Sequence, residues 1–142
     1  MPVVDASVVV DWIAPGSDPL SPSARALDRL AREDAEVLAP RLLLEEVANG
    51  LLTGIRRQRW SGASADASYA LLLDLPVHLV DERRDLERAW DLSRRHDNHP
   101  VYDMLYVALA ERRRMELVTV DRRLRRRLST TPWIVGPEEI AH

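Results

Sequence analysis

Residues 101–121 read VYDMLYVALAERRRMELVTVD, a pattern that predicts a buried helix followed by a short interior strand. Asp103 is the only formal charge among the first ten of these residues, so the helix is apolar on nearly every side. The run LVTV at 117–120 predicts a strand that delivers Asp121 at its carboxyl end. Because desolvating a lone carboxylate is costly, Asp103 needs a proton, a hydrogen-bond donor, a base or a metal ion. The stretch therefore directs two acids toward one region.

Elsewhere in the chain, short apolar runs alternate with helical patterns of about ten to fifteen residues. This alternation predicts an α/β domain with a mostly parallel sheet. The run VVVDWI at 8–13 is ambiguous, because its valines favour a strand whereas Ser7 as an N-cap favours a helix. Further strands are expected from Val3 and at 37–39, 77–80 and 133–135, and further helices at 22–33, 42–57, 65–75 and 82–96.

Composition excludes several kinds of site. The chain has 142 residues, a formal net charge of −3, no cysteine and no lysine. Disulfides, cysteine-ligated metals, a Walker lysine and a lysine Schiff base are therefore ruled out. The length suits a single domain. The first residues show no signal peptide, and no window of the sequence approaches the length and apolarity of a membrane helix, so we expect a cytoplasmic protein without membrane contact.

Four acids are expected to meet beyond the carboxyl edge of the sheet, where parallel sheets place their functional crevice. Asp5 and Asp121 follow two of the strands, and Glu46 and Asp103 lie on helices that can face the same crevice. Four carboxylates in one pocket repel each other, which raises their pKa values unless a cation keeps them ionised. Oxygen ligands without cysteine favour Mg²⁺ or Mn²⁺, and such a site supports hydrolysis of a phosphodiester.

Four short motifs occur in order along the chain: DAS at 5–7, EVANGL from Glu46, VYDMLYVALAE around Asp103 and TVD ending at Asp121. Together they resemble the PIN-domain ribonucleases, and specifically the VapC-type toxins of bacterial toxin–antitoxin systems. The resemblance covers almost the whole chain. It implies a single PIN domain over residues 1–142, with a three-layer α/β/α fold and a mostly parallel sheet of about five strands. It also implies that the first strand stops near Ala6, so that Ser7 begins a helix.

The resemblance also implies roles for particular residues. The family's acidic quartet is catalytic and binds a divalent metal, Mg²⁺ with Mn²⁺ as a substitute, and it is matched by Asp5, Glu46, Asp103 and Asp121. Glu46 is preferred to Glu45 because it precedes the small-residue and asparagine pattern of Val47-Ala48-Asn49. Supporting positions are matched by Ser7, Asn49 and Thr119.

Clustered arginines and the resemblance together suggest an RNA partner. Basic side chains contact phosphates without reading sequence, and the candidates are Arg112, Arg113, Arg122 and Arg123. The alternative is that they are helix-end charges on solvated faces. The resemblance implies action on structured RNA such as tRNA or rRNA, neutralisation by a cognate VapB-like antitoxin, and a homodimer. His96 and His99 are expected to be solvated loop residues.

Three functional readings follow. The preferred one is a metal-dependent endoribonuclease toxin. The second is a catalytically silent PIN-like module that binds RNA or protein without cutting. The third is a phosphohydrolase of the haloacid dehalogenase type, suggested by an aspartate after the first strand, but Asp5-Ala6-Ser7 lacks that class's second aspartate two residues on.

Overall fold

The computed structural model describes residues 1–140, and its strands form one five-stranded sheet in the order β3-β2-β1-β4-β5. Every neighbouring pair of strands is parallel. The strands are β1 (Val3–Val4), β2 (Val37–Pro40), β3 (Val77–Val80), β4 (Leu117–Val118) and β5 (Ile134–Val135). The predicted α/β class and the five parallel strands are therefore confirmed.

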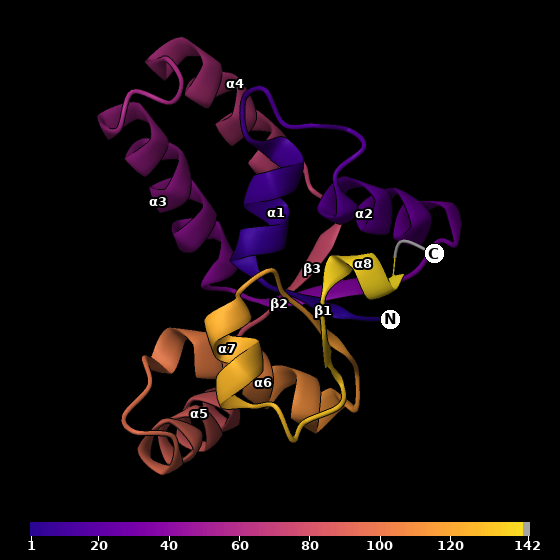
Figure 1. Cartoon of the computed structure of the whole chain (residues 1–142), viewed down its shortest axis with the longest axis vertical. Coiled ribbons are helices and arrows are strands. Elements are labelled where there is room, and N and C mark those ends of the chain that lie inside the picture. The colour runs from indigo at the N-terminus through magenta and orange to yellow at the C-terminus, as the bar shows by residue number, and fades with distance from the viewer. Residues whose placement is uncertain (141–142) are drawn as a thin grey trace.

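Helices cover both faces of the sheet. Figure 1 shows α1 to α4 on one side and α5, α6 and α7 on the other, which confirms the three-layer arrangement. Within residues 1–140, none of the helices has the length and apolar character to span a bilayer. The helices are α1 (Ala6–Ile13), α2 (Pro22–Arg32), α3 (Leu43–Arg56), α4 (Gly62–Leu73), α5 (Arg83–Arg95), α6 (Val101–Arg113), α7 (Arg122–Arg127) and α8 (Pro137–Ile140).

The central strand β1 is where the chain reverses its direction of travel across the sheet. From β1 the chain moves to β2 and then β3, and α5 and α6 carry it back to β4 on the other side of β1. Val4 of β1 pairs with Val118 of β4, so Asp5 and Thr119 leave the sheet side by side. Ligands of open parallel sheets bind outside the carboxyl ends of strands at such a reversal. By this rule, the ends of β1 and β4 are where a ligand is expected to bind.

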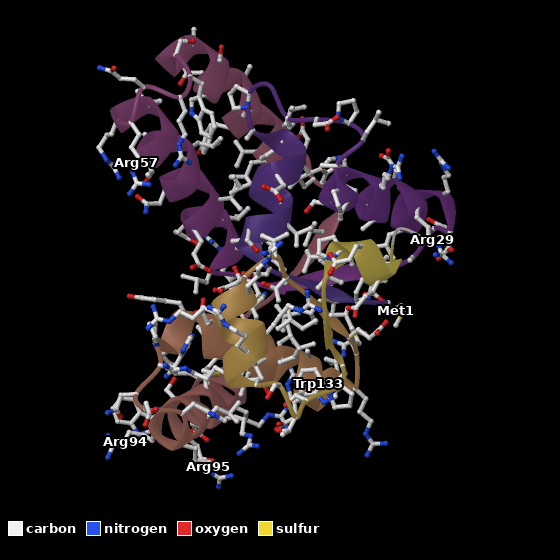
Figure 2. The ribbon with its side chains drawn as sticks, in the orientation of Figure 1. Met1, Arg29, Arg57, Arg94, Arg95 and Trp133 are labelled. Atoms are coloured by element: carbon white, nitrogen blue, oxygen red, sulfur yellow. The ribbon has the colours of Figure 1, made fainter. Side chains whose placement is uncertain are left out.

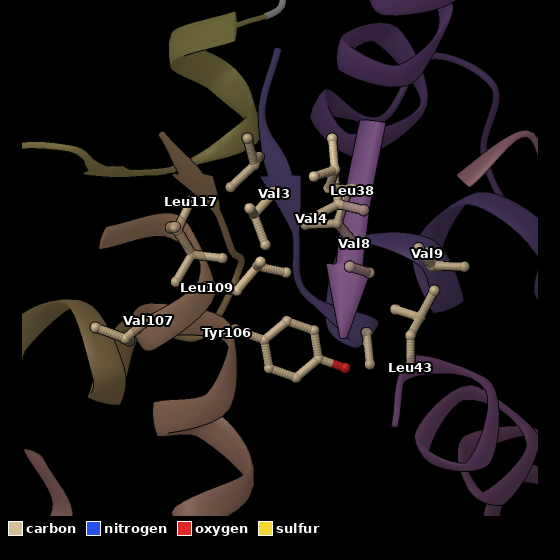
Figure 3. Close-up of a cluster of buried hydrophobic side chains, with 14 of the residues drawn as sticks. Val3, Val4, Val8, Val9, Leu38, Leu43, Tyr106, Val107, Leu109 and Leu117 are labelled. Carbon is tan, nitrogen blue, oxygen red and sulfur yellow. The ribbon is translucent and has the colours of Figure 1, made fainter. Parts of the chain in front are cut away.

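Helix α6 forms much of the hydrophobic core. Every residue from Tyr106 to Ala110 is buried, as the apolar pattern predicted. Figure 3 shows Tyr106 and Leu109 among the valine and leucine side chains of the neighbouring strands. Met104 is fully buried in the same core. A tightly packed α6 holds Asp103 in a fixed place relative to the sheet.

Local boundaries differ from the expectation in a few places. Residues 8–13 are helical, as the family resemblance implied, although helix α1 begins at Ala6, one residue before the expected start at Ser7. Helix α4 begins at Gly62 rather than at residue 65, because the Ser61 hydroxyl accepts a hydrogen bond from the backbone N–H of Ser64 and so caps the helix earlier. Strand β4 has two residues instead of four. The short helices α7 and α8 were not predicted.

Candidate active site

Asp5 is the most buried of the four predicted acids. It follows β1, is only 8% exposed, and serves as the extended residue before α1. Its Oδ2 accepts hydrogen bonds from the Ser7 hydroxyl at 2.9 Å and from the Thr119 hydroxyl at 2.6 Å. Two of the three predicted supporting residues therefore contact this acid directly.

The same two hydroxyls also hold the chain that leaves β4. Thr119 Oγ1 accepts the backbone N–H of Asp121 at 3.0 Å, and Ser7 Oγ accepts the backbone N–H of Val120 at 3.3 Å. Each hydroxyl donates to Asp5 and accepts a backbone N–H from Val120 or Asp121. The ends of β1 and β4 are therefore joined by side chains as well as by the sheet.

Glu46 reaches the site from the first turn of α3. The hydroxyl of Tyr106 on α6 donates a 2.7 Å hydrogen bond to Glu46 Oε1. Figure 3 shows the Tyr106 ring within the core and its hydroxyl directed toward the side on which Leu43 of α3 lies. Glu45, by contrast, is exposed and paired with Arg41 at 2.6 Å. This geometry supports the choice of Glu46, and it identifies Tyr106, which the sequence pattern had classed only as apolar.

Asp103 is paired with a histidine. His99 Nε2 lies 2.6 Å from Asp103 Oδ2, and the histidine is only 4% exposed. The prediction that His99 is a solvated loop residue is therefore wrong. His99 does lie in the loop, just before the N-cap residue Pro100, and its position four residues before Asp103 brings its side chain within reach of the first turn of α6.

Asp121 lies three residues beyond β4 and caps α7. Its Oδ1 accepts the backbone N–H of Leu124 at 3.1 Å. Its own backbone N–H is bonded to Thr119, which contacts Asp5. Asp121 thus joins the site through Thr119, while its side chain is engaged at the helix N-terminus.

Mutual repulsion identifies which acids are close together. Burial raises the pKa of Asp5, and the nearby charge of Asp103 raises it further, against hydrogen bonds from Thr119 and Ser7 that lower it. Burial also raises the pKa of Glu46, with additional contributions from Asp5 and Asp103. Asp5, Glu46 and Asp103 therefore form one electrostatic cluster, although they come from three separate parts of the chain.

Within residues 1–140, the side-chain donors to Asp5, Glu46 and Asp103 and the Leu124 backbone donor to Asp121 each reach a single oxygen of the carboxylate. The bonded atoms are Asp5 Oδ2, Glu46 Oε1, Asp103 Oδ2 and Asp121 Oδ1. Within residues 1–140, the second oxygen of each carboxylate receives no hydrogen bond from a side chain. One anchored oxygen and one available oxygen per acid is a donor set that suits a hard divalent cation.

The acids are not drawn together around a single point. No group of three or more acidic or histidine side chains in residues 1–140 is arranged closely enough to hold one ion. The chemistry of the four acids fits a cation, but the structure shows only a loose cluster of Asp5, Glu46 and Asp103, to which Asp121 is linked through Thr119.

The remaining predicted residues have varied surroundings. Arg112 forms a bidentate ion pair with the buried Asp85, at 2.7 and 2.9 Å, which counts against an RNA contact at this residue.

Asn49 is exposed, and its side chain makes no hydrogen bond with another residue in the range 1–140, so its supporting role stays a prediction. Residues Arg113, Arg122 and Arg123 are exposed. Figure 2 shows that Arg57, Arg94 and Arg95 also lie at the outer ends of their helices.

Comparison with known proteins identifies the family of this chain. A sequence model of the PIN domain matches residues 3–127. Ribonuclease VapC1 from Mycobacterium tuberculosis is 38% identical over 127 residues, which cover 86% of this chain and 86% of VapC1. Ribonuclease VapC3 from the same organism is 38% identical over 124 residues, covering 87% and 85% respectively.

A solved structure provides an independent view of the fold. The crystal structure of Mycobacterium tuberculosis VapC20, a toxin that cleaves the sarcin–ricin loop, matches with a TM-score of 0.59 over 82% of this chain and 87% of that one. At 20% identity this likeness shows the fold alone. The family model and the two closer relatives go further: the chain belongs to the PIN-domain family and, within it, to the VapC ribonucleases.

Proposed function

We propose that this protein is a metal-dependent endoribonuclease toxin that hydrolyses phosphodiester bonds in structured RNA such as tRNA or rRNA. One observation carries the proposal. Asp5, at the reversal point of the sheet, forms a loose electrostatic cluster with Glu46 and Asp103, and each of the three has one oxygen held by a protein donor and a second without a side-chain donor. Mg²⁺ is the proposed cofactor, and Mn²⁺ is expected to substitute for it.

Some residues would hold the cation, and others fix the carboxylates that hold it. A divalent cation bound by the acids would supply a water of lowered pKa and would stabilise charge on the phosphate. Asp5, Glu46, Asp103 and Asp121 are the residues that would hold it. Ser7 and Thr119 fix one oxygen of Asp5, and Tyr106 fixes one oxygen of Glu46, so the carboxylates lose less freedom when the cation binds.

The substrate and partners follow from family membership and remain part of the proposal. Single-stranded loops of folded RNA expose their backbone, and Arg113, Arg122 and Arg123 are available to contact phosphates. A cognate VapB-like antitoxin is expected to cover the crevice, and the toxin is expected to form a homodimer. A cytoplasmic location and a single PIN domain over residues 1–142 complete the proposal.

The decisive experiment compares neutral isosteres of the acids with a neighbouring control. Asp5→Asn, Glu46→Gln and Asp103→Asn are each expected to lower the rate of Mg²⁺-dependent cleavage of a structured RNA by about 100-fold or more. Glu45→Gln is the matched control, because Glu45 adjoins Glu46 in the sequence but pairs with Arg41 on the surface. RNA ends are mapped by sequencing, with and without EDTA.

Two results would contradict the proposal. Cleavage by Asp103→Asn at the wild-type rate would exclude the acids as the catalytic centre. RNA binding without any metal-dependent product would favour the silent binding module instead.

A further inference from the structure

His99 is a buried histidine that contacts one of the acids. Its side chain is 3% exposed, compared with 27% for that of Asp103, and the two meet at 2.6 Å through His99 Nε2. The second ring nitrogen, Nδ1, is also buried and has no hydrogen-bond partner within residues 1–140. A buried polar atom without a partner costs free energy, so packing considerations alone do not favour a histidine here.

The loop before α6 contains two residues with strained backbone conformations directly before His99. Asp97 and Asn98 both have left-handed backbone conformations, with φ of 55° and 57°. Such conformations cost free energy in residues other than glycine, although Asp and Asn tolerate them better than most. The loop is braced by Arg127, which donates a 2.6 Å hydrogen bond to the carbonyl of His96. A braced loop with two strained residues fixes the position of His99.

The other two clustered acids show the same arrangement. Thr119 donates to Asp5, and Tyr106 donates to Glu46, each through one carboxylate oxygen. His99 approaches only Oδ2 of Asp103 and leaves Oδ1 without a side-chain donor in the described residues. Each acid therefore has its own protein donor on one oxygen.

We propose that His99 is a positioning residue that donates its Nε2–H to Asp103 Oδ2 and thereby presents Oδ1 to the divalent cation. This inference rests on the proposed metal-dependent function. In this tautomer Nδ1 carries the lone pair, which agrees with its lack of an acceptor. Donors behind carboxylate ligands orient them, and their loss typically lowers metal affinity or activity by about 10- to 100-fold.

Three variants of His99 separate positioning from packing. His99→Gln keeps an N–H donor with similar reach, His99→Leu keeps bulk without a donor, and His99→Asn keeps an amide that is too short to reach Asp103. The matched control is His96→Leu in the same loop, since the His96 side chain makes no hydrogen bond within residues 1–140. Each protein is stripped of metal, and its Mn²⁺ affinity is measured by calorimetric titration, alongside kcat and KM for RNA cleavage.

The variants are expected to differ in Mn²⁺ affinity and in kcat. His99→Leu and His99→Asn should bind Mn²⁺ about 10- to 100-fold more weakly and lose kcat with little change in KM, while His99→Gln and His96→Leu stay close to wild type. If His99→Leu fails to fold, the difference in Mn²⁺ affinity between His99→Gln and His99→Asn still tests the positioning role. In an Asp103→Asn background the effect of His99→Asn should vanish.

Failure of this inference is distinguishable from failure of the proposed function. Wild-type Mn²⁺ affinity in His99→Asn, or equal loss in His99→Gln and His99→Asn, would overturn the positioning role while wild-type cleavage stands. If the unaltered protein neither binds Mn²⁺ nor cleaves RNA, the proposed function itself fails and the inference fails with it.

Discussion

Thr119 Oγ1 donates a 2.6 Å hydrogen bond to Asp5 Oδ2, which links two residues 114 positions apart in the sequence. Thr119 is fully buried, and Asp5 is nearly so. The same hydroxyl accepts the backbone N–H of Asp121. The Thr119 side chain therefore links Asp5 to the backbone of Asp121.

Replacement of Thr119 by valine tests this bridge. Thr119→Val keeps the shape but removes both hydrogen bonds, and we expect a loss of about 1–3 kcal/mol in the free energy of unfolding because Asp5 and the Asp121 N–H lose a partner. Chemical denaturation measures the change. The exposed Thr130→Val is the control and should be within about 0.5 kcal/mol of wild type. Equal stability of the two variants would contradict the assigned role.

Ionisation of Asp5 should make the metal-free protein less stable as the pH rises. The pKa of Asp5 is raised in the folded state above its ordinary value of 3.8, so the protonated form is the one that folding favours. The stabilisation that protonated Asp5 gives to the folded state is complete below pH 3.8 and is lost as the pH rises through the folded-state pKa of Asp5. Asp5→Asn removes this dependence and should be more stable than wild type at neutral pH in EDTA.

Thermal unfolding in EDTA across a pH series measures this difference. The gap in Tm between Asp5→Asn and wild type should widen as the pH rises and then level off, and saturating Mg²⁺ should narrow it by stabilising the wild type alone. A gap that does not change with pH would show that Asp5 ionisation is not coupled to folding.

Tyr106→Phe tests the hydrogen bond to Glu46. Removal of the hydroxyl takes away an interaction that lowers the pKa of Glu46, so this pKa should rise further and Mn²⁺ affinity at neutral pH should fall by about tenfold. Calorimetric titration gives the affinity. Tyr102→Phe, on the same helix but 56% exposed, is the matched control. A similar affinity in both variants would argue that the hydroxyl serves packing alone.

The arginines should separate into two groups. Arg112→Ala breaks the ion pair with buried Asp85 and is expected to cost about 2 kcal/mol of stability. Arg113→Ala, on the exposed side of the same helix end, should leave stability nearly unchanged but weaken RNA binding and reduce its salt dependence. Urea denaturation and filter binding at two salt concentrations distinguish the groups. Weakened RNA binding by Arg112→Ala alone would reverse the assignment.

Much of the fold was predictable because local pattern and burial agree. The apolar stretch around Asp103 is helical and buried, and the runs at 37–39 and 77–80 are strands. Helices α7 and α8 were missed because they are short, and α7 contains a single apolar residue, Leu124, within an arginine run. Such helices depend on a cap and on tertiary contacts rather than on periodicity.

The parts of the site that the sequence did not reveal depend on tertiary placement. His99 was expected to be solvated because it lies in a polar loop, but the tertiary structure buries it, directly after two residues with left-handed backbone conformations. Tyr106 fits an apolar helix face equally well whether or not its hydroxyl has a partner. The pairing of Arg112 with Asp85 joins neighbouring helices, which no local pattern encodes. Asp103 was found because it is the only charge in an apolar stretch, and Asp5 and Asp121 because they follow strands. Glu46 was chosen over Glu45 through the family resemblance.

The pairing of β1 with β4 has a consequence for synthesis of the protein. During translation Asp5 is made 114 residues before its partner Thr119. Until then the nascent chain lacks the strand that completes the centre of the sheet, and the acids have no common location. Shortened products that end before β4 should therefore be harmless to the cell that makes them.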